Sequence, residues 1–368
     1  MTAVPTTAAT GHVLGLDAAS YTDATIYQRE LNEIFAKTWI LIGHVNQLAE
    51  PGRIVTARVG DESIVVTNDG AGAAPGGRNL KAFFNVCRHR GHELVPEQTT
   101  TAQSITCPYH AWTYDLSGRL LHARGEKVGE LCIPEVRIDT MAGFLFANLD
   151  ANAAPLADYA PGVEAELLAL APDAGDRHLV IRRTHHIAAN WKIAVENYNE
   201  CYHCPNVHKT FSAGVVAPAS YRVRPDGNVI RHSADGPSQA KAAYAEATAH
   251  AEYGSFFTWP VSSIQCYPGR VLNTFRWLPL GVDQTLLIRE WWSASPEPTP
   301  EIEAIADLDW ATTVAEDFDL MDSVQRGVSS RGYRPGPLIT AADGVATIHS
   351  EDAVPHLQQL WRAGLGAR

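Results

Sequence analysis

Apolar residues near the start of the chain recur at helical intervals. Large apolar side chains between Tyr21 and Trp39 are mostly three or four residues apart, the spacing of one face of an α-helix. Thr22 or Asp23 offers the side-chain oxygen that an N-cap requires. The pattern predicts a helix over residues 21–39, preceded by a loose tail over residues 1–15.

The pattern changes beyond this helix to short β-branched runs that are separated by turn residues. These runs cover residues 53–59, 62–68, 81–86, 104–107 and 142–149. Glycines and a proline at residues 71–77 predict a flexible hairpin connection, and residues 115–118 predict a second turn. The runs together predict a small antiparallel β domain.

The second half of the chain mixes strand and helix patterns. Residues 151–176 are rich in alanine, proline and aspartate, which favours a linker with one short helix. Strands are predicted at residues 178–186, 256–261, 263–267, 271–278 and 284–293. Helices are predicted over residues 190–204 and 301–326, with a long loop-rich region from the first of these to residue 254.

The predicted fold class is therefore α+β, with a small antiparallel β domain and a larger α+β domain. In the larger domain an antiparallel sheet is expected to be flanked by helices. Residues 1–40 would form the tail and a helix that packs on the larger domain. Residues 41–150 would form the small domain and residues 151–368 the larger one, which is reasonable for a chain of 368 residues.

Composition narrows the possible partners. The 29 basic residues against 41 acidic ones give a net charge of −12, which argues against nucleic acid or an anionic membrane and leaves a small-molecule substrate. No apolar run approaches the ~20 residues that a membrane span needs. The N-terminus lacks the basic start and apolar core of a signal peptide, so a cytoplasmic location is the default expectation.

The first group of candidate metal ligands is a Cys-x-His pair and a Cys-x2-His pair. Cys87 and His89 form one pair, and Cys107 and His110 form the other, each at a predicted strand end. Two thiolates and two imidazoles can hold a tetrahedral zinc. They can also hold a Rieske [2Fe–2S] cluster, in which the cysteines bind one iron and the histidines bind the other.

The second group lies in residues 190–208. On a helix, Glu196, Asn197, Glu200 and His203 would share one face, because they fall at positions i, i+1, i+4 and i+7. A proline at position 205 is expected to end this helix, and the break would let His203 and His208 converge on one metal. The alternative is a surface helix with solvated acids and two unrelated histidines.

A third ligand would have to be a carboxylate, and helical geometry selects one from the predicted helix 301–326. Asp317 lies on its apolar face, whereas Glu316, Asp319 and Asp322 project toward the polar side. Burying an unpaired carboxylate is costly, so a cation or a metal is expected beside Asp317. A buried salt bridge is the alternative. With the two histidines, Asp317 would complete a two-histidine, one-carboxylate triad.

These motifs resemble those of the Rieske non-haem iron oxygenases. The resemblance rests on Cys-Arg-His-Arg-Gly at 87–91, Cys-Pro-Tyr-His-Ala-Trp at 107–112 and Glu-x2-His-x4-His at 200–208. It implies that residues 41–150 are a Rieske domain and residues 151–368 a catalytic domain. Cys87, His89, Cys107 and His110 would bind the [2Fe–2S] cluster, and His203, His208 and Asp317 would bind a mononuclear Fe(II). The family usually has glycine where this chain has Ala111.

The resemblance also implies an activity and its partners. The chain would be a terminal oxygenase (alpha) subunit that uses O2 and electrons from a separate NAD(P)H-dependent reductase, in some systems through a ferredoxin. Glu200 would bridge the cluster ligand His110 of one subunit and the iron ligand His203 of its neighbour. The family builds head-to-tail trimers for this purpose, so a homotrimer is expected.

Residues 189–204 look most like the branch that oxidises quaternary ammonium compounds such as glycine betaine, stachydrine and carnitine. Aromatic side chains could hold a methylated cation over their ring faces; the candidates are Tyr202, Phe256, Phe257, Trp259, Tyr267, Phe275 and Trp277. Two alternatives stay open. One is a ring-hydroxylating dioxygenase of aromatic hydrocarbon catabolism or an aromatic O-demethylase, and the other is a zinc-binding or electron-transfer protein.

The remaining cysteines carry weaker signals. The six cysteines are more typical of thiols or metal ligands than of a disulfide framework. Cys201 and Cys204 have the spacing of a dithiol redox motif, but packing beneath the iron site is the favoured interpretation. Cys132 and Cys266 are predicted to be core thiols.

Overall fold

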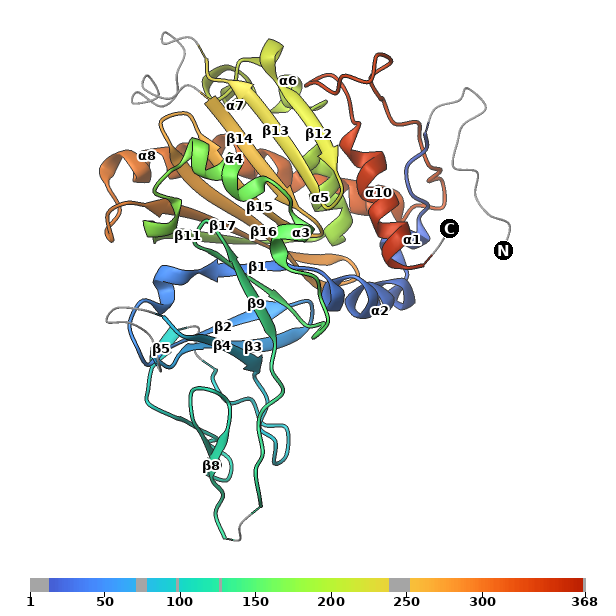
Figure 1. Cartoon of the computed structure of the whole chain (residues 1–368). Helices are drawn as coiled ribbons and strands as arrows, with labels where there is room; N and C mark the ends of the chain where they lie inside the picture. The colour runs from blue at the N-terminus through green and yellow to red at the C-terminus, as the bar shows by residue number, and fades with distance from the viewer. Residues whose placement is uncertain (1–12, 71–77, 97–98, 126–127, 238–251, 367–368) are drawn as a thin grey trace. The chain divides into compact units, whose positions relative to one another are not determined.

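The computed structural model describes residues 13–70, 78–96, 99–125, 128–237 and 252–366 (Figure 1). The chain forms two compact units: Ala36–Asp158 is the smaller, and Met1–Phe35 joins Tyr159–Arg368 in the larger. Most of the predicted tail and all of the predicted hairpin connection at 71–77 lie outside the described residues.

The smaller unit consists of three antiparallel sheets. The strand orders are β4-β3-β2-β5, β1-β10-β9 and β6-β7-β8. The strands are β1 (Ile40–His44), β2 (Arg53–Val59), β3 (Glu62–Asn68), β4 (Leu80–Phe84), β5 (Thr99–Thr101), β6 (Ile105–Thr106), β7 (Thr113–Tyr114), β8 (Leu120–His122), β9 (Arg137–Met141) and β10 (Phe144–Asn148). The predictions for β2 and β3 are confirmed at both ends, whereas β1, β5, β7, β8 and β9 were not predicted.

One hydrophobic core runs through this unit and includes both candidate cysteines. Cys87 and Cys107 are 3% and 2% exposed and pack with Phe83, Tyr114 and Ile133 among others. The predicted turn at residues 115–118 closes the β7–β8 hairpin, with the Gly118 amide donating to the Asp115 carbonyl at 3.0 Å. The core therefore fixes the positions from which the two cysteine-containing loops project.

The larger unit is built on a seven-stranded antiparallel sheet, as Figure 1 shows. Its order is β11-β17-β16-β15-β14-β13-β12. The strands are β11 (His178–Ile187), β12 (Arg222–Asp226), β13 (Val229–Asp235), β14 (Glu252–Thr258), β15 (Ser262–Tyr267), β16 (Val271–Gly281) and β17 (Gln284–Ser293). Every residue of β15 is buried, so both faces of the sheet are covered there. The predicted α+β class is confirmed.

Two of these strands were predicted as loop. β12 and β13 form a hairpin at the edge of the sheet, and β12 alternates buried with exposed residues. The proline at position 225 and the Asp-Gly pair at 226–227 are turn signals in the sequence. An edge strand tolerates a proline because its outer backbone groups have no ladder partner, so these signals marked the hairpin and not a loop.

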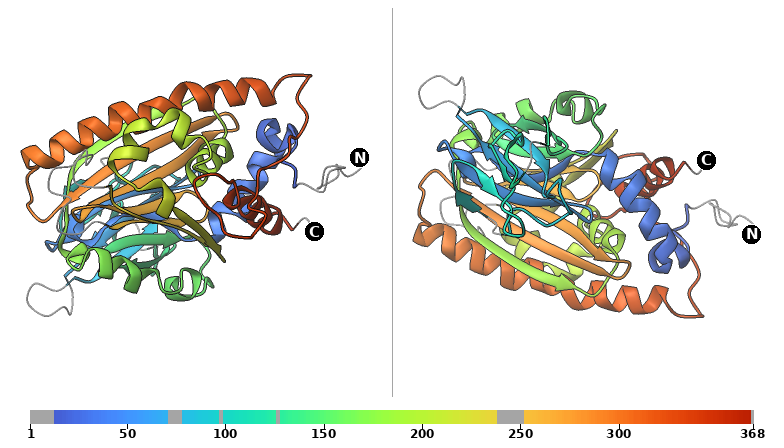
Figure 2. Two further views of the ribbon diagram at one scale, coloured as in Figure 1. Left: turned by 90° about the horizontal axis from the view of Figure 1, so that it is seen from above. Right: turned by 90° about the horizontal axis from the view of Figure 1, so that it is seen from below.

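The helices of the larger unit include a long helical run beside the sheet, which Figure 2 shows in orange. The α-helices of the chain are α1 (Ala19–Thr22), α2 (Ala24–Glu33), α3 (Leu156–Tyr159), α4 (Val163–Leu170), α5 (Trp191–Asn199), α6 (Cys204–Val207), α7 (Lys209–Gly214), α8 (Pro300–Asp309), α9 (Phe318–Val328) and α10 (Ala353–Gly364). Between α8 and α9 the run passes through a π-helical turn, Trp310–Val314, and a 3₁₀ turn, Ala315–Asp317. The predicted linker at 151–176 holds two short α-helices, α3 and α4, and not one.

The first predicted helix is divided in two. Asp23 has an extended backbone, and its carboxylate accepts hydrogen bonds from the amides of Thr25 and Ile26. The N-cap prediction is confirmed for α2, but α2 ends at Glu33, before Trp39.

The predicted helix over 190–204 is wrong in its second half. α5 ends at Asn199, and Glu200 has extended backbone angles of −114° and 142°. Pro205 lies in the first turn of α6, where its missing N–H costs nothing, so this proline begins a helix and does not end one. The predicted shared face of Glu196, Asn197, Glu200 and His203 therefore does not exist.

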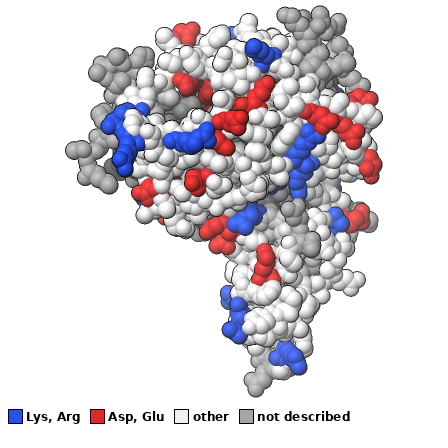
Figure 3. Space-filling view, turned by 180° about the vertical axis from the view of Figure 1, so that it is seen from behind, with Lys and Arg blue, Asp and Glu red and all other residues white. Residues whose placement is uncertain are grey.

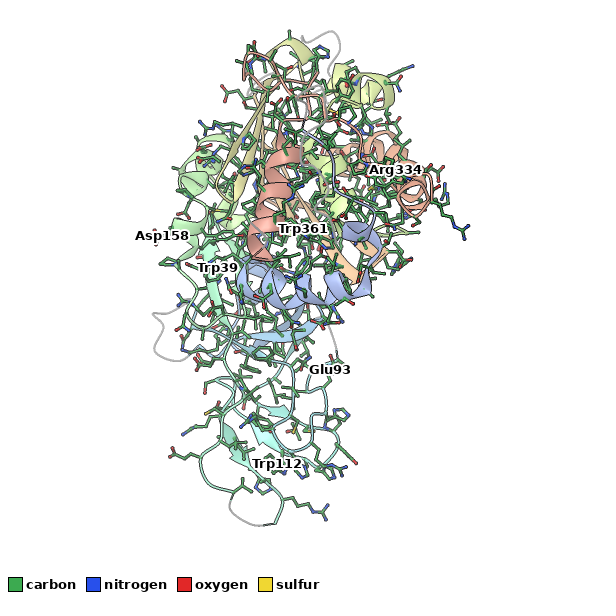
Figure 4. All side chains as sticks on the ribbon, turned by 90° about the vertical axis from the view of Figure 1, so that its right-hand side faces the viewer. Trp39, Glu93, Trp112, Asp158, Arg334 and Trp361 are labelled. Carbon is green, nitrogen blue, oxygen red and sulfur yellow. A yellow bond between two sulfur atoms is a disulfide. The ribbon has the colours of Figure 1, made fainter. Side chains whose placement is uncertain are left out.

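A buried polar cluster joins the two ends of the chain inside the larger unit. The Glu30 carboxylate accepts hydrogen bonds from the indoles of Trp191 at 2.8 Å and Trp361 at 2.6 Å, and it pairs with Lys192. Trp361 is labelled on α10 in Figure 4. Burial lowers the pKa of Lys192, while Glu30 opposes that shift. Hydrogen bonds and an ion pair of this cluster therefore connect helices α2, α5 and α10.

Glu196 of α5 lies beside the cluster and has an altered pKa. Burial raises the pKa of Glu196 to about 7, although Tyr21 donates to the carboxylate at 2.8 Å and Gln358 at 3.1 Å, and Lys192 and Arg362 lie nearby. A carboxyl group with a raised pKa binds more protons in the folded chain than in the unfolded chain. The contribution of Glu196 to the free energy of unfolding is therefore lost as the pH rises from about 4.5 to 7.

A Glu196→Gln variant is expected to remove this pH dependence. The neutral amide keeps the bond from Tyr21, and its N–H group can donate to the Gln358 side-chain oxygen, which is buried without a partner. The variant should be more stable than the parent by about 3 kcal/mol at pH 8, and this difference should nearly vanish at pH 4. Denaturant melts at several pH values measure this, and equal pH slopes for both proteins would contradict it.

The surface carries both signs of charge. Figure 3 shows acidic and basic side chains next to one another on one face of the molecule. None of the helices within the described residues is both long enough and apolar enough to cross a bilayer.

Candidate active site and metal centres

Two loops of the smaller unit have the same backbone construction around the candidate cysteines. The amide four residues after each cysteine donates to that cysteine's carbonyl at 3.0 Å, from Gly91 to Cys87 and from Ala111 to Cys107. Gly91 and Ala111 both have left-handed backbone angles, with φ of +71° and +58°. The loops therefore present their cysteine and histidine side chains in equivalent ways.

The side chains of these loops suit a metal cluster. The rings of His89 and His110 meet edge to face with centroids 4.6 Å apart, and Trp112, labelled in Figure 4, stacks on His89 at 4.7 Å. The Nδ1 atom of His110 is buried and has no hydrogen-bond partner among the residues that the structure describes, as expected of a ring nitrogen that serves as a ligand. Desolvation lowers the pKa of His110, as do His89 and Arg90, which favours the neutral ring that binds metals. The two cysteines and two histidines of these loops therefore fit a metal cluster.

Ala111 holds a conformation that glycine adopts more readily. An L-residue in the left-handed region is destabilised by roughly 1 kcal/mol, and about half of this would be offset by glycine's freedom in the unfolded chain. Ala111→Gly should therefore stabilise the protein by about 0.5 kcal/mol. Gly91→Ala is the matched reverse change, because an added Cβ there meets nothing within 4 Å and changes only the backbone preference. Melts of both variants, followed by cluster absorbance, should shift in opposite directions.

The larger unit brings His203, His208 and Asp317 together. One possible ligand atom from each lies within 4.8 Å of the others. The two histidine Nε2 atoms are 3.1 Å apart. The Asp317 carboxylate lies 3.1 Å from Nε2 of His208 and 3.7 Å from Nε2 of His203. The expected convergence of the two histidines is present, although the chain break that permits it precedes His203 and does not follow it.

The opposite nitrogen of each histidine contacts a second carboxylate. Nδ1 of His203 is 2.5 Å from Glu200, and Nδ1 of His208 is 2.9 Å from Glu316. When Nδ1 donates to a carboxylate, the Nε2 of a neutral ring is left with a lone pair. Two lone pairs and the Asp317 carboxylate then face a common point, which is the arrangement that a divalent cation requires. Burial opposes a charge on His208, but Asp317 and Glu316 raise its pKa nonetheless.

Sequence reasoning placed Glu316 on the polar side of its helix, and it missed this contact. The prediction assumed a continuous α-helix, with 100° of rotation per residue. The π-helical and 3₁₀ turns before α9 change that rotation, so adjacent residues 316 and 317 both reach the histidines. Asn197 donates to the Asp317 carboxylate at 3.3 Å.

A partly enclosed cavity lies next to these three side chains. Its aromatic lining consists of Tyr198, Phe211, Tyr221, Tyr253, Tyr267, Phe275 and Trp277. Tyr267, Phe275 and Trp277 had been predicted to be near the pocket. Among the other candidates, Tyr202 is 50% exposed. Phe256, Phe257 and Trp259 are buried in or beside β14 and are not part of the cavity wall.

The cysteine predictions need two corrections. Cys201 and Cys204 form a disulfide, so the expectation of free packing thiols is wrong. At the turn between α5 and α6 their Cα atoms are 4.8 Å apart, within the range that a disulfide spans. Cys132 is exposed and not in the core, whereas the prediction of a buried Cys266 is confirmed.

Comparison with known proteins gives matches in both units. Residues 38–136 match the Rieske [2Fe–2S] domain, and residues 175–367 match the ring hydroxylating alpha subunit (catalytic domain). The carnitine monooxygenase oxygenase subunit of Escherichia coli (strain K12) is 34% identical, over 94% of this chain and 92% of that protein. The glycine betaine monooxygenase oxygenase subunit of Pseudomonas aeruginosa (strain UCBPP-PA14) is 26% identical, over 89% and 85%.

A solved structure also matches nearly the whole chain. The quaternary ammonium Rieske monooxygenase CntA in complex with L-carnitine superimposes with a TM-score of 0.84 at 30% identity, over 96% of each chain. The family matches, together with the two groups of candidate ligands, identify an iron-dependent oxygenase. The chain belongs to the Rieske non-haem iron oxygenases, as an oxygenase subunit with a [2Fe–2S] cluster and a mononuclear iron as its cofactors. A zinc-binding or electron-transfer function for the whole chain is thereby set aside.

Proposed function

We propose that this oxygenase subunit oxidises a small quaternary ammonium compound with O2. The observation that carries the proposal is the lining of the cavity beside His203, His208 and Asp317. Seven of its side chains are aromatic, and among the described residues that line it none is lysine or arginine. Aromatic faces attract methylated cations, and the carboxylates of Glu200 and Asp317 add to that attraction.

The relatives support this choice of substrate class. Two of them are named as carnitine and glycine betaine monooxygenases, and both compounds carry a trimethylammonium group. An aromatic lining also suits a flat aromatic ring, so a ring-hydroxylating dioxygenase or an O-demethylase is the competing outcome of the test.

We assign the ligands by unit. Cys87, Cys107, His89 and His110 would hold the cluster in a Rieske domain formed by the smaller unit. His203, His208 and Asp317 would hold the iron in a catalytic domain formed by the larger unit. When bound, the cluster supplies single electrons and the iron supplies the site at which O2 is activated.

Other side chains position these ligands. Glu200 and Glu316 hold the two histidine rings through Nδ1, and Asn197 orients Asp317. Glu200 is also 15% exposed, so one carboxylate edge can contact another group. We propose that this group is His110 of a neighbouring copy, in a homotrimer of the kind the family forms. A separate NAD(P)H-dependent reductase, with or without a ferredoxin, would supply the electrons.

The test is a single turnover of the dithionite-reduced protein with O2. Separate reactions would contain carnitine, glycine betaine, stachydrine, benzoate and naphthalene, and mass spectrometry would detect aldehydes, free amines and hydroxylated rings. We expect N-demethylated or C–N-cleaved products from at least one ammonium compound. Ring hydroxylation with all ammonium compounds unchanged would overturn the proposal in favour of the aromatic alternative.

A further inference from the structure

A buried ionic network lies behind one wall of the cavity. Arg289 is fully buried and donates to Asp309 at 3.0 Å and to the side-chain oxygen of Gln265 at 3.3 Å. A guanidinium group can donate hydrogen bonds but cannot accept them. The amide of Gln265 must therefore turn its oxygen toward Arg289 and its NH2 group away from it.

The NH2 group of Gln265 meets two tyrosines of the cavity wall. It donates to the hydroxyl of Tyr198 at 2.7 Å and to that of Tyr253 at 3.1 Å. Both of its hydrogens are used in this way, so each hydroxyl accepts one bond. Each tyrosine hydroxyl can still donate its own proton, and its other neighbours determine the acceptor.

Two of the four lining tyrosines donate their protons to neighbouring protein groups. Tyr267 donates to Asp309 at 2.8 Å. Tyr221 lies 2.9 Å from Nδ1 of His232, whose pKa burial lowers to about 3, so the ring is neutral. The other nitrogen of His232 faces the side-chain oxygen of Asn199 at 3.3 Å and must donate to it. Nδ1 is thus an acceptor, and Tyr221 donates to it.

Tyr198 is also saturated. Its hydroxyl lies 2.7 Å from Ser255 and 2.6 Å from Ser263, in addition to the bond from Gln265. A phenolic oxygen donates once and accepts twice, so these three partners use its full capacity. The two serine hydroxyls are themselves 3.1 Å apart and complete a closed ring of bonds.

Tyr253 is different from the other three. It is 4% exposed, and its hydroxyl accepts from Gln265 while its proton has no acceptor among the described residues. Burial raises the pKa of Tyr253, so the hydroxyl keeps its proton. A hydrogen bond with Ser255 lowers the pKa of Tyr253, as expected when the serine hydroxyl donates to the phenolic oxygen, so this contact does not use the Tyr253 proton. The tyrosines of the wall therefore offer one buried hydrogen-bond donor to a ligand, and Arg289, which is paired with Asp309, lies behind it.

We infer that Tyr253 is a specificity-determining residue that donates a hydrogen bond to the carboxylate of a zwitterionic ammonium substrate. The inference rests on the proposed function and adds to it, because the aromatic faces alone would not distinguish a betaine from a simple alkylammonium ion. A hydrogen bond from a buried neutral donor to a charged acceptor changes a dissociation constant by about tenfold or more. Arg289 and Gln265 are positioning residues in this arrangement.

Calorimetric titration of the holoenzyme with two matched ligands tests the inference. One ligand is 4-(trimethylammonio)butanoate and the other is butyltrimethylammonium, which has the same cation and chain without the carboxylate. Tyr253→Phe should raise the dissociation constant of the butanoate about tenfold and leave that of the alkylammonium within about twofold. The control, Tyr221→Phe, removes a hydroxyl of the same wall that is bonded to His232, and it should change both constants by the same factor.

A second variant leaves the Tyr253 hydroxyl in place but redirects its proton. In Gln265→Glu the new carboxylate can accept from Tyr253, so discrimination between the two ligands should fall as it does in Tyr253→Phe. Equal changes for both ligands in Tyr253→Phe, or no change, would overturn the role of Tyr253 while the proposed function stands. Failure of the parent protein to bind either cation would instead overturn the proposed function.

Discussion

An Asp317→Ala variant is expected to lose one of three irons per chain and nearly all turnover. Its carboxylate is the third member of the group with His203 and His208, at 3.1 Å and 3.7 Å from their Nε2 atoms. Loss of an outer partner of a metal ligand typically costs 10- to 100-fold, so loss of the ligand itself should reduce turnover by more than about 100-fold. Iron analysis and the product assay described above measure both effects.

The matched control is Asp319→Ala, which removes an exposed acid from the same helical run. That variant should keep three irons and the parent's turnover. The absorbance and paramagnetic resonance of the reduced cluster should be unchanged in both variants, because the cluster ligands lie in the other unit. An Asp317→Ala protein with three irons and normal turnover would show that Asp317 is not a ligand.

Replacement of Glu200 by glutamine should keep both metals bound and suppress turnover by about 100-fold. The carboxylate contacts His203 twice, at Nδ1 and at the backbone amide. The amide side chain has the same size but no charge, so it holds the ring less firmly and no longer stabilises a positive charge on it. It also weakens the proposed link to a neighbouring copy.

Glu316→Gln separates these two effects. Glu316 supports His208 in the same way that Glu200 supports His203, but it is not assigned to the route between subunits. In a single turnover, the reduced cluster should be reoxidised slowly in Glu200→Gln and at nearly the parent rate in Glu316→Gln. Equal rates in the two variants would reduce Glu200 to a supporting residue and contradict the bridging role.

The sequence was most informative where hydrophobic periodicity and burial agree. β2 and β3 are rich in β-branched residues, and the strands from β14 to β17 are rich in β-branched and aromatic residues, so their existence was predictable. The candidate ligands were recognisable because Cys-x-His and His-x4-His spacings are uncommon. Their supporting acids had no such signal, since Glu316 looks like any polar residue of an amphipathic helix.

The misses around the iron site share one physical cause, which is local backbone geometry that departs from the ideal repeat. Pro205 reads equally well as the end of one helix or the start of the next, and only tertiary packing decides. The π-helical turn at Trp310–Val314 changes the rotation per residue, and the prediction that Asp317 and Glu316 face opposite sides of the helix assumed a regular rotation. The Cys201–Cys204 disulfide lies at the turn between α5 and α6, where the sequence predicted a continuous helix.

The larger unit is discontinuous in sequence, and this has a consequence for biosynthesis. Glu30 near the start of the chain needs Trp361 near its end, and a backbone bond joins Gly15 to Gly336. The smaller unit, Ala36–Asp158, is made without interruption, so it can fold during translation. The helices ahead of it must wait until the last helix leaves the ribosome. A nascent chain could therefore have a finished cluster-binding unit long before its iron-binding unit can close.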